Sequence, residues 1–166
     1  MGLFSNLFGP PDLTRDWPPA VEGVLPEVDL TARTFGSLRF GDGLDSASVL
    51  GKPDRSKPTK DCHDLYYDHL GFVVSFELNR FVELRFDIIP EAGSRARAAQ
   101  PRATGGVIFT PETSKQDLER LYGPPTENES YGTYEIVQYV HGPLISEFEY
   151  DLKTEKLAGW MVYLNE

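Results

Sequence analysis

The 166-residue sequence has one cysteine, Cys62, and no long apolar run. A single cysteine excludes an internal disulfide and a zinc cage built from several thiolates. No stretch approaches the roughly 20 apolar residues of a membrane-spanning helix. The first ten residues lack the basic region and the apolar core of a secretory signal. These absences predict a cytoplasmic protein with no transmembrane segment, and nothing in the sequence indicates a cofactor.

Basic residues are also scarce, with 16 Lys and Arg against 26 Asp and Glu. The formal net charge of −10 makes nucleic acid an unfavourable partner, because an acidic chain repels a phosphate backbone. Residues 104–166 carry most of the imbalance, with 4 basic and 11 acidic side chains. Apolar residues make up 40% of the chain, which is enough to bury a core.

Five prolines in residues 1–33 predict an extended N-terminal arm, because proline restricts the backbone and removes a donor. A short apolar stripe lies in this arm, at Leu3, Phe4, Leu7 and Phe8. It could dock on a membrane, on a partner or on its own domain, and the sequence does not decide among the three. Residues 91–104 are rich in Ala, Arg and Gly and are expected to form a linker.

The rest of the chain is interpreted as one module written twice, at residues 34–90 and 105–166. Gly51 and Gly123 lie 72 residues apart, and Phe76 and Phe148 are separated by the same distance. Each glycine ends a short predicted helix, and strand-like runs follow it. The chain is therefore expected to be an α+β protein of two tandem modules, each a short helix on an antiparallel β-meander.

The second helix has the clearest boundary signals. Thr110 is expected to be its N-cap, with Pro111 at the first helical position, where a missing N–H costs nothing. Leu118, Leu121 and Tyr122 are expected to form its buried stripe.

Alternation of apolar and polar residues predicts that one sheet face packs on the helices and the other is bare. The apolar positions expected to face the helices include Val82, Leu84 and Phe86. Glu77, Glu83, Arg85 and Asp87 then lie on the bare face in the first module. By the same parity, the bare face of the second module carries Glu147, Glu149, Asp151, Met161 and Tyr163.

Two stretches, Leu50-Gly51-Lys52-Pro53-Asp54 and Leu121-Tyr122-Gly123-Pro124-Pro125, carry a resemblance to a known family. With the strand runs that follow, they resemble the beta-lactamase-inhibitor-protein fold and its relatives among small outer-membrane assembly lipoproteins (SmpA/OmlA-like). The resemblance covers about residues 36–164 and implies a bare, concave sheet face that binds protein without catalysis. The chain departs from the lipoproteins because it lacks a lipidated cysteine at its start, and from the inhibitors because Cys62 has no partner.

The sequence therefore predicts a non-catalytic bacterial protein-binding module of inhibitor, immunity or assembly-adaptor type. The partner is expected to be another protein with a basic surface, because acidic steering speeds association and aromatic side chains supply affinity. The sequence does not indicate the oligomeric state. It also leaves open the alternative that the acidic face is simply solvated and maintains solubility. The expected contact residues are Glu147, Glu149, Asp151, Met161, Tyr163, Tyr139, Glu77 and Arg85. For Tyr139, a position in the core is the alternative.

A second hypothesis is a small enzyme or metal-binding protein with its site around Cys62, His63 and His69. Thiolate and imidazole are soft-metal ligands, and a cysteine with a histidine base is a nucleophile pair. Against it, Cys62 and His63 on one strand point to opposite faces. His69 precedes Gly71 at an expected hairpin, where His is an ordinary turn residue.

Overall fold

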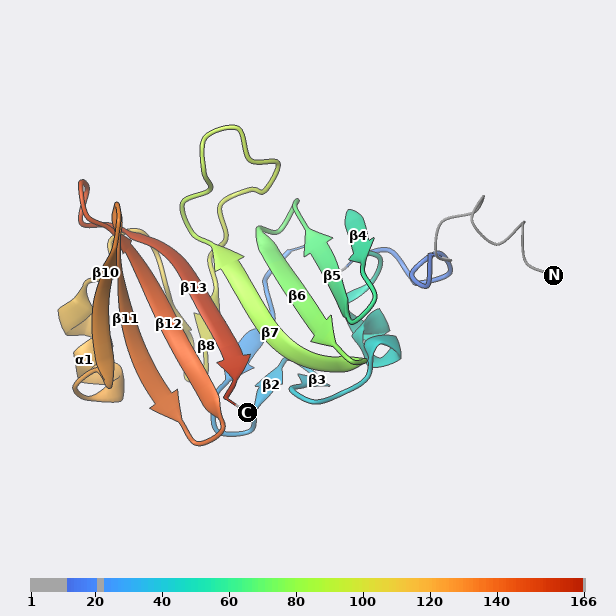
Figure 1. Ribbon diagram of the computed structural model, residues 1–166, viewed down its shortest axis with the longest axis horizontal. Helices are drawn as coiled ribbons and strands as arrows, with labels where there is room; N and C mark the ends of the chain where they lie inside the picture. The colour runs from blue at the N-terminus through green and yellow to red at the C-terminus, as the bar shows by residue number, and fades with distance from the viewer. Residues whose placement is uncertain (1–11, 21–22, 166) are drawn as a thin grey trace.

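The computed structural model describes residues 12–20 and 23–165. The protein is mostly β, with an eight-stranded antiparallel sheet, a five-stranded mixed sheet and two short helices (Figure 1). The apolar stripe expected at Leu3, Phe4, Leu7 and Phe8 lies outside the described residues. Within them, neither helix has the length and apolar content needed to traverse a bilayer.

The large sheet contains the longer strands, in the order β10-β11-β12-β13-β7-β6-β5-β4. Their bounds are β4 (Arg55–Pro58), β5 (Cys62–Tyr67), β6 (Phe72–Glu77), β7 (Arg80–Asp87), β10 (Glu127–Tyr131), β11 (Tyr134–His141), β12 (Leu144–Asp151) and β13 (Leu157–Leu164). It therefore consists of two four-stranded meanders, β4 to β7 and β10 to β13. The two meet where β7 pairs with β13, with Phe86 opposite Trp160.

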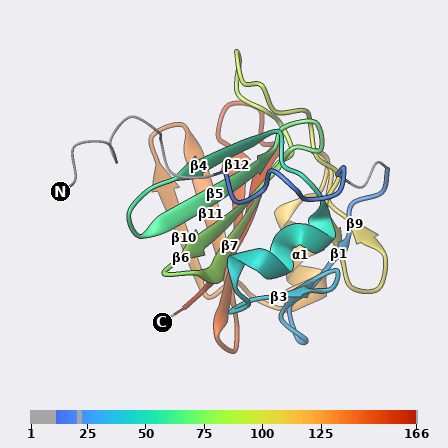
Figure 2. The same cartoon turned by 90° about the vertical axis from the view of Figure 1, so that its right-hand side faces the viewer.

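The small sheet is assembled from short strands in the order β3-β2-β1-β8-β9. Their bounds are β1 (Glu27–Asp29), β2 (Thr34–Phe35), β3 (Leu38–Arg39), β8 (Arg102–Ala103) and β9 (Val107–Ile108). Parallel pairing of β1 with β8 joins residues of the expected arm to residues of the expected linker. The small sheet and the helical segments lie on one side of the large sheet, which leaves the other side open (Figures 1 and 2).

Two glycines end the two helices, as their positions before Pro-containing stretches predict. The 3₁₀ helix η1 (Leu44–Leu50) ends at Gly51, and α1 (Lys115–Tyr122) ends at Gly123. Both glycines have positive φ, 77° and 83°, a region that side chains disfavour. Because these two helices are short, the fold is mostly β, which corrects the expectation of an α+β protein.

The expected start of the second helix is wrong. Ser114 is the N-cap of α1, and its side chain and that of Asp117 form a reciprocal capping box. Thr110 instead closes a turn in which its carbonyl accepts from the amide of Thr113. The capping box satisfies two free donors at once, so the helix begins four residues later than Pro111 indicates. Leu118 is fully buried, whereas Leu121 is 45% exposed and does not belong to the buried stripe.

The alternation in β7 also differs from expectation at one position. A register shift between Ser75 and Phe76 of the neighbouring strand places Phe81 in the core instead of Val82. Beyond the shift the alternation holds, with Leu84 and Phe86 buried.

One continuous hydrophobic core lies between the two sheets and the helices. Its centre is Trp160, whose ring lies 5.4 Å from Phe86, 4.7 Å from Phe109 and 5.6 Å from Phe148 between centroids. The indole N–H donates to the Ser146 hydroxyl at 2.7 Å, which satisfies both buried polar groups. Side chains from both meanders thus meet at one buried indole.

The close approach of the β5–β6 turn to the loop after β7 gives a test of the packing. Gly71 has φ of 74°, and a Cβ there would overlap the carbonyl oxygen of Arg97. We expect Gly71→Ala to lower the free energy of unfolding by about 2 kcal/mol more than Gly142→Ala, because overpacking adds to strain. Gly142 is the matched control, with φ of 62° and no atom within 4 Å of an added Cβ. Urea unfolding measures both, and equal losses would show that the Gly71 contact does not constrain the fold.

Candidate functional site on the open face of the large sheet

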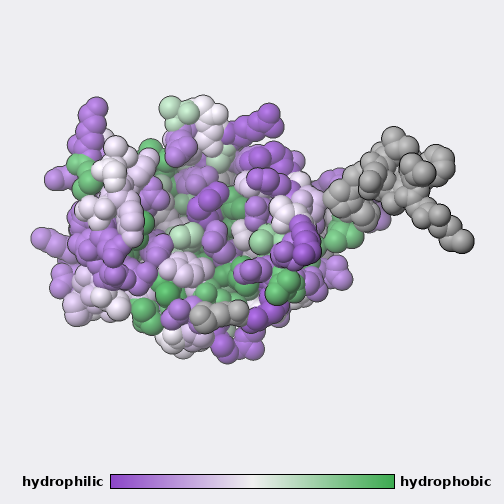
Figure 3. Space-filling model, in the orientation of Figure 1, coloured by the Kyte–Doolittle hydropathy of each residue, from purple (hydrophilic) through white to green (hydrophobic). Residues whose placement is uncertain are grey.

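The open face of the large sheet is the candidate site, because no element of the described chain covers it (Figure 2). At the centre of the sheet, Glu83, Arg85 and Asp87 of β7 pair with Tyr163, Met161 and Gly159 of β13. Hydrophilic and hydrophobic residues are interspersed over this side of the molecule (Figure 3).

A hollow of about 340 Å³ lies in this face over β7, β11, β12 and β13. Its polar walls include Asp87, Glu147 and Glu149, and its apolar lining includes Ile136 and Met161. Gly159 also lines it, between Asp87 and Glu149 in the register of the sheet. The missing side chain at Gly159 leaves space between these two carboxyl groups.

A second hollow of similar volume adjoins the first over β10 and β11. Glu127, Glu129 and Tyr131 line it, and Ile136 and Glu147 line both hollows. The two therefore form one groove across the second meander, which we call the acidic groove. It is defined by Glu127, Glu129, Ile136, Glu147, Glu149, Gly159 and Met161.

Glu147 is held in position between the two hollows. Its Oε1 accepts a hydrogen bond of 2.7 Å from the Tyr163 hydroxyl and one of 3.0 Å from the Gln138 amide. These donors fix the carboxylate at the point where the hollows join. Tyr163 was expected as a contact residue in its own right, and here it also orients Glu147.

Several carboxyl groups of this face have raised pKa values. Burial raises the pKa of Glu149, and the neighbouring Glu91 carboxylate raises it further. Burial likewise raises the pKa of Glu83 and Asp87, which Arg85 partly offsets. A hydrogen bond with Glu129 raises the pKa of Glu127. Burial thus makes the charged form of these carboxyl groups unfavourable, and a cation placed beside them would stabilise it.

Five of the contact residues expected from sequence lie together at this face, and one of them is Tyr163, which donates to Glu147. Glu147, Glu149 and Met161 line the groove with Arg85. Glu77 lies away from them, opposite Cys62 at the far end of the first meander. Asp151 ends β12, where it accepts backbone N–H bonds from Lys153 and Thr154 and organises the following turn.

The expectation that Tyr139 contributes to the open face is wrong. Tyr139 is 3% exposed and lies on the inner face, with its ring 5.3 Å from Tyr122 and 6.0 Å from Phe148. Val137 shares this inner face, so the alternation of β11 buries the odd-numbered residues.

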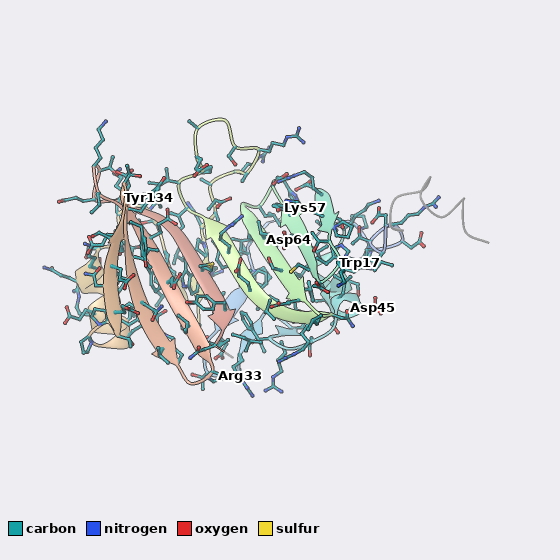
Figure 4. The ribbon with its side chains drawn as sticks, in the orientation of Figure 1. Trp17, Arg33, Asp45, Lys57, Asp64 and Tyr134 are labelled. Atoms are coloured by element: carbon teal, nitrogen blue, oxygen red, sulfur yellow. The ribbon has the colours of Figure 1, made fainter. Side chains whose placement is uncertain are left out.

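The part of the groove that β10 and β11 supply was not among the residues predicted from the sequence. Tyr134 and Ile136 lie on the open face, in register with Asp151 and Glu149. Figure 4 labels Tyr134 near one end of the large sheet and Asp64 near the other. The run Tyr134 to Val140 contains Ile136 and Val137 side by side, so its apolar pattern does not show which face is buried. The alternating acids Glu127 and Glu129 were the available signal.

Cys62, His63 and His69 are not brought together. Cys62 is exposed at the start of β5, and His63 lies one residue on, facing the other side, with its Nε2 2.6 Å from the Ser56 hydroxyl. His69 lies beyond the end of β5, where its Nδ1 is 2.5 Å from Asp54. Within residues 12–20 and 23–165, no three His, Cys, Asp or Glu side chains are grouped to hold a metal ion.

No protein-family model and no curated protein matches this sequence. Solved structures do. An extracellular protein containing an SCP domain from Bacillus anthracis matches with a TM-score of 0.50 and 10% identity, over 76% of this chain and 44% of that one. A DUF4309 family protein (YjgB) from Bacillus subtilis matches with a TM-score of 0.45 and 15% identity, over 72% of this chain and 76% of that one. A cysteine-rich secretory protein from Staphylococcus aureus matches with a TM-score of 0.49 and 12% identity, over 86% of this chain and 50% of that one. The chain thus spans about half the length of the first and third.

These matches correct two expectations. The resemblance to the beta-lactamase-inhibitor and SmpA/OmlA-like families is overturned, because the fold is instead similar to part of the Bacillus anthracis extracellular protein. The stretches ending in Gly51 and Gly123 are general helix stops, so they do not identify a family. The expected cytoplasmic location is also contradicted, since the Bacillus anthracis protein to which the fold is similar is described as extracellular. A lone cysteine does not distinguish compartments.

The raised pKa of Glu149 gives a stability test. A carboxyl whose folded pKa is raised binds a proton more readily in the folded state, so its charge destabilises the fold at neutral pH. We expect Glu149→Gln to stabilise the protein at pH 7.5 by about 0.5 kcal/mol, the size of a cross-strand like-charge pair. The gain should shrink near pH 4, where the native carboxyl is protonated. Thermal unfolding at both pH values measures it, with the exposed Glu119→Gln as control. A gain that is equal at both pH values would contradict the charge of the half-buried, repelled Glu149 carboxylate as its cause.

Proposed function

We propose that this protein is a non-catalytic protein-binding module whose acidic groove receives a basic segment of another protein. One observation carries the proposal: the open sheet face combines a hollow, an apolar floor at Ile136 and Met161, and carboxyl groups with raised pKa. A solvated surface does not need an apolar floor between half-buried acids. A protein-binding surface needs both, since apolar contact supplies affinity and charge supplies selectivity.

The physical basis of the interaction is compensation of the negative charge in the groove by a cation of the partner. Glu149 and Asp87 are half-buried on either side of Gly159, and Arg85 is the cation beside them, 3.9 Å from Asp87. A lysine or arginine side chain entering the hollow would compensate the remaining charge in a partly desolvated place, where ion pairs are stronger than at an open surface. Its aliphatic stem would pack on Met161 and Ile136.

The sheet architecture supports an interface wider than the groove. We infer that the two meanders act as a pair of related modules. Each meander is preceded by a short helix, and that helix ends at a glycine with positive φ. Their open faces are continuous across β7 and β13, so a partner seated in the groove would also reach Glu83 and Arg85. The inhibitor, immunity and adaptor roles share this mode of binding.

The test compares two double variants that change the net charge equally. We expect Glu147→Gln/Glu149→Gln to weaken binding of a short labelled peptide that alternates lysine with leucine by about tenfold, or ~1.4 kcal/mol. Glu119→Gln/Glu155→Gln removes two exposed acids outside the groove and should leave the affinity nearly unchanged. Fluorescence anisotropy at two salt concentrations measures both, and circular dichroism checks folding.

Equal weakening by both double variants would show that the peptide responds to net charge alone, which would overturn the groove as the site. A peptide with serine in place of leucine provides the second comparison. It keeps the charge and should bind more weakly, because it cannot use the apolar floor.

A further inference from the structure

A second hollow, on the side of the small sheet, has the opposite charge. It measures about 420 Å³ and is lined by residues 23–25, the β5–β6 turn, the segment before β8, and one residue each of β8 and β9. Three of its side chains are potential cations, namely His69, Arg97 and Arg102. No carboxylate of the described chain lines it. In a protein of net charge −10, such a local excess of positive charge requires an explanation.

Arg102 provides the first evidence for a missing partner. Its Nε is buried and has no hydrogen-bond partner within residues 12–20 and 23–165. A buried donor without a partner costs about 1–3 kcal/mol, so native structures almost always satisfy it. Glu27 is opposite Arg102 in the β1–β8 pairing, yet it is exposed and forms no ion pair with it among the described residues.

Two arginines elsewhere in the protein, Arg55 and Arg120, show what a paired guanidinium looks like here. Arg55 donates to Asp68 through Nε at 2.6 Å, and Arg120 pairs with Asp117. Neither Arg97 nor Arg102 has such a pair in the described part of the chain. Two guanidinium groups without carboxylates therefore line one hollow, where their planar donors suit a bidentate oxyanion.

His69 adds a positioned imidazole at the same hollow. Its Nδ1 lies 2.5 Å from Asp54, and its backbone N–H donates to the same carboxylate oxygen at 2.9 Å. The Asp54 contact uses one ring nitrogen and leaves Nε2 available to a ligand.

Apart from Gln100, the remaining side chains that line the hollow are apolar, and two of them are largely open to solvent. Val24 is 70% exposed and Ile108 47% exposed, beside the buried Leu25. An inorganic anion would make no use of these surfaces. A ligand with a hydrocarbon portion would cover them while its charged end meets the arginines.

We propose that this hollow binds a small organic carboxylate, with its carboxylate on Arg97 and Arg102 and its hydrocarbon portion on Val24 and Ile108. The site is separate from the acidic groove, and it stands or fails independently of the protein-binding function. A small-molecule carboxylate site would give the module a ligand-dependent state on the face away from its partner.

Isothermal titration and amide chemical shifts with hexanoate as the probe test the proposal. We expect saturable binding that shifts the amides of residues 97–108. Arg97→Gln should weaken it at least tenfold, and Ile108→Ser should weaken it by a smaller factor. Arg95→Gln is the matched control, because Arg95 is an exposed arginine of the same loop outside the hollow, and it should leave the affinity unchanged. Hexanoate binding of Arg102→Gln is measured in the same way, with circular dichroism to confirm that this variant folds.

Two further probes separate charge from shape. Hexanamide keeps the chain and removes the charge, so it should bind at least tenfold more weakly than hexanoate. Inorganic phosphate keeps charge and lacks the chain, so it should also bind more weakly. No saturable hexanoate binding, equal binding of hexanamide, tighter binding of phosphate, or equal effects of Arg95→Gln and Arg97→Gln would each overturn the proposal.

Discussion

Antiparallel pairing of β7 with β13 joins the two meanders, and the rest of the molecule is arranged around it. On the inner side this pairing sets Phe86 against Trp160, whose ring also contacts Phe109 and Phe148. On the outer side it sets Arg85 against Met161 and opens the space beside Gly159. The same backbone hydrogen bonds thus position the centre of the core and the centre of the acidic groove. A change that moves one must move the other, because alternate residues of a strand are rigidly linked.

Charge is separated between the two sides of the protein. The acidic groove gathers half-buried carboxyl groups on the open face, whereas Arg97 and Arg102 line a hollow on the side of the small sheet. Neither set is fully neutralised within the described chain, although the two together would balance in part. Charges kept apart in this way retain their attraction for external partners of opposite sign. The loop after β7 contributes to both hollows, through Glu91 to the first and Arg97 to the second.

The sequence was most informative where a local rule decides the structure. Glycine before proline located the ends of both helices, and strict alternation placed Glu147, Glu149 and Met161 on one face. It was least informative where tertiary pairing decides. Strands β1 and β8 are only two or three residues long. Each depends on pairing with the other and with a second short strand, β2 or β9, so their segments looked like an arm and a linker. Adjacent apolar residues in β11 concealed the burial of Tyr139. The hollow lined by Arg97 and Arg102 is formed by residues that range from Val24 to Ile108, and no local sequence pattern connects them.

The order of the strands has a consequence for synthesis of the chain. β13 follows every other strand of the described residues, yet it lies between β12 and β7 in the sheet. While residues 157–164 remain in the ribosome exit tunnel, both neighbours of β13 present long unpaired edges to other nascent chains. A polypeptide interrupted before Leu157 would keep these two edges permanently, and it would lack the indole on which both halves pack. Emergence of β13 therefore covers both of these edges in one step.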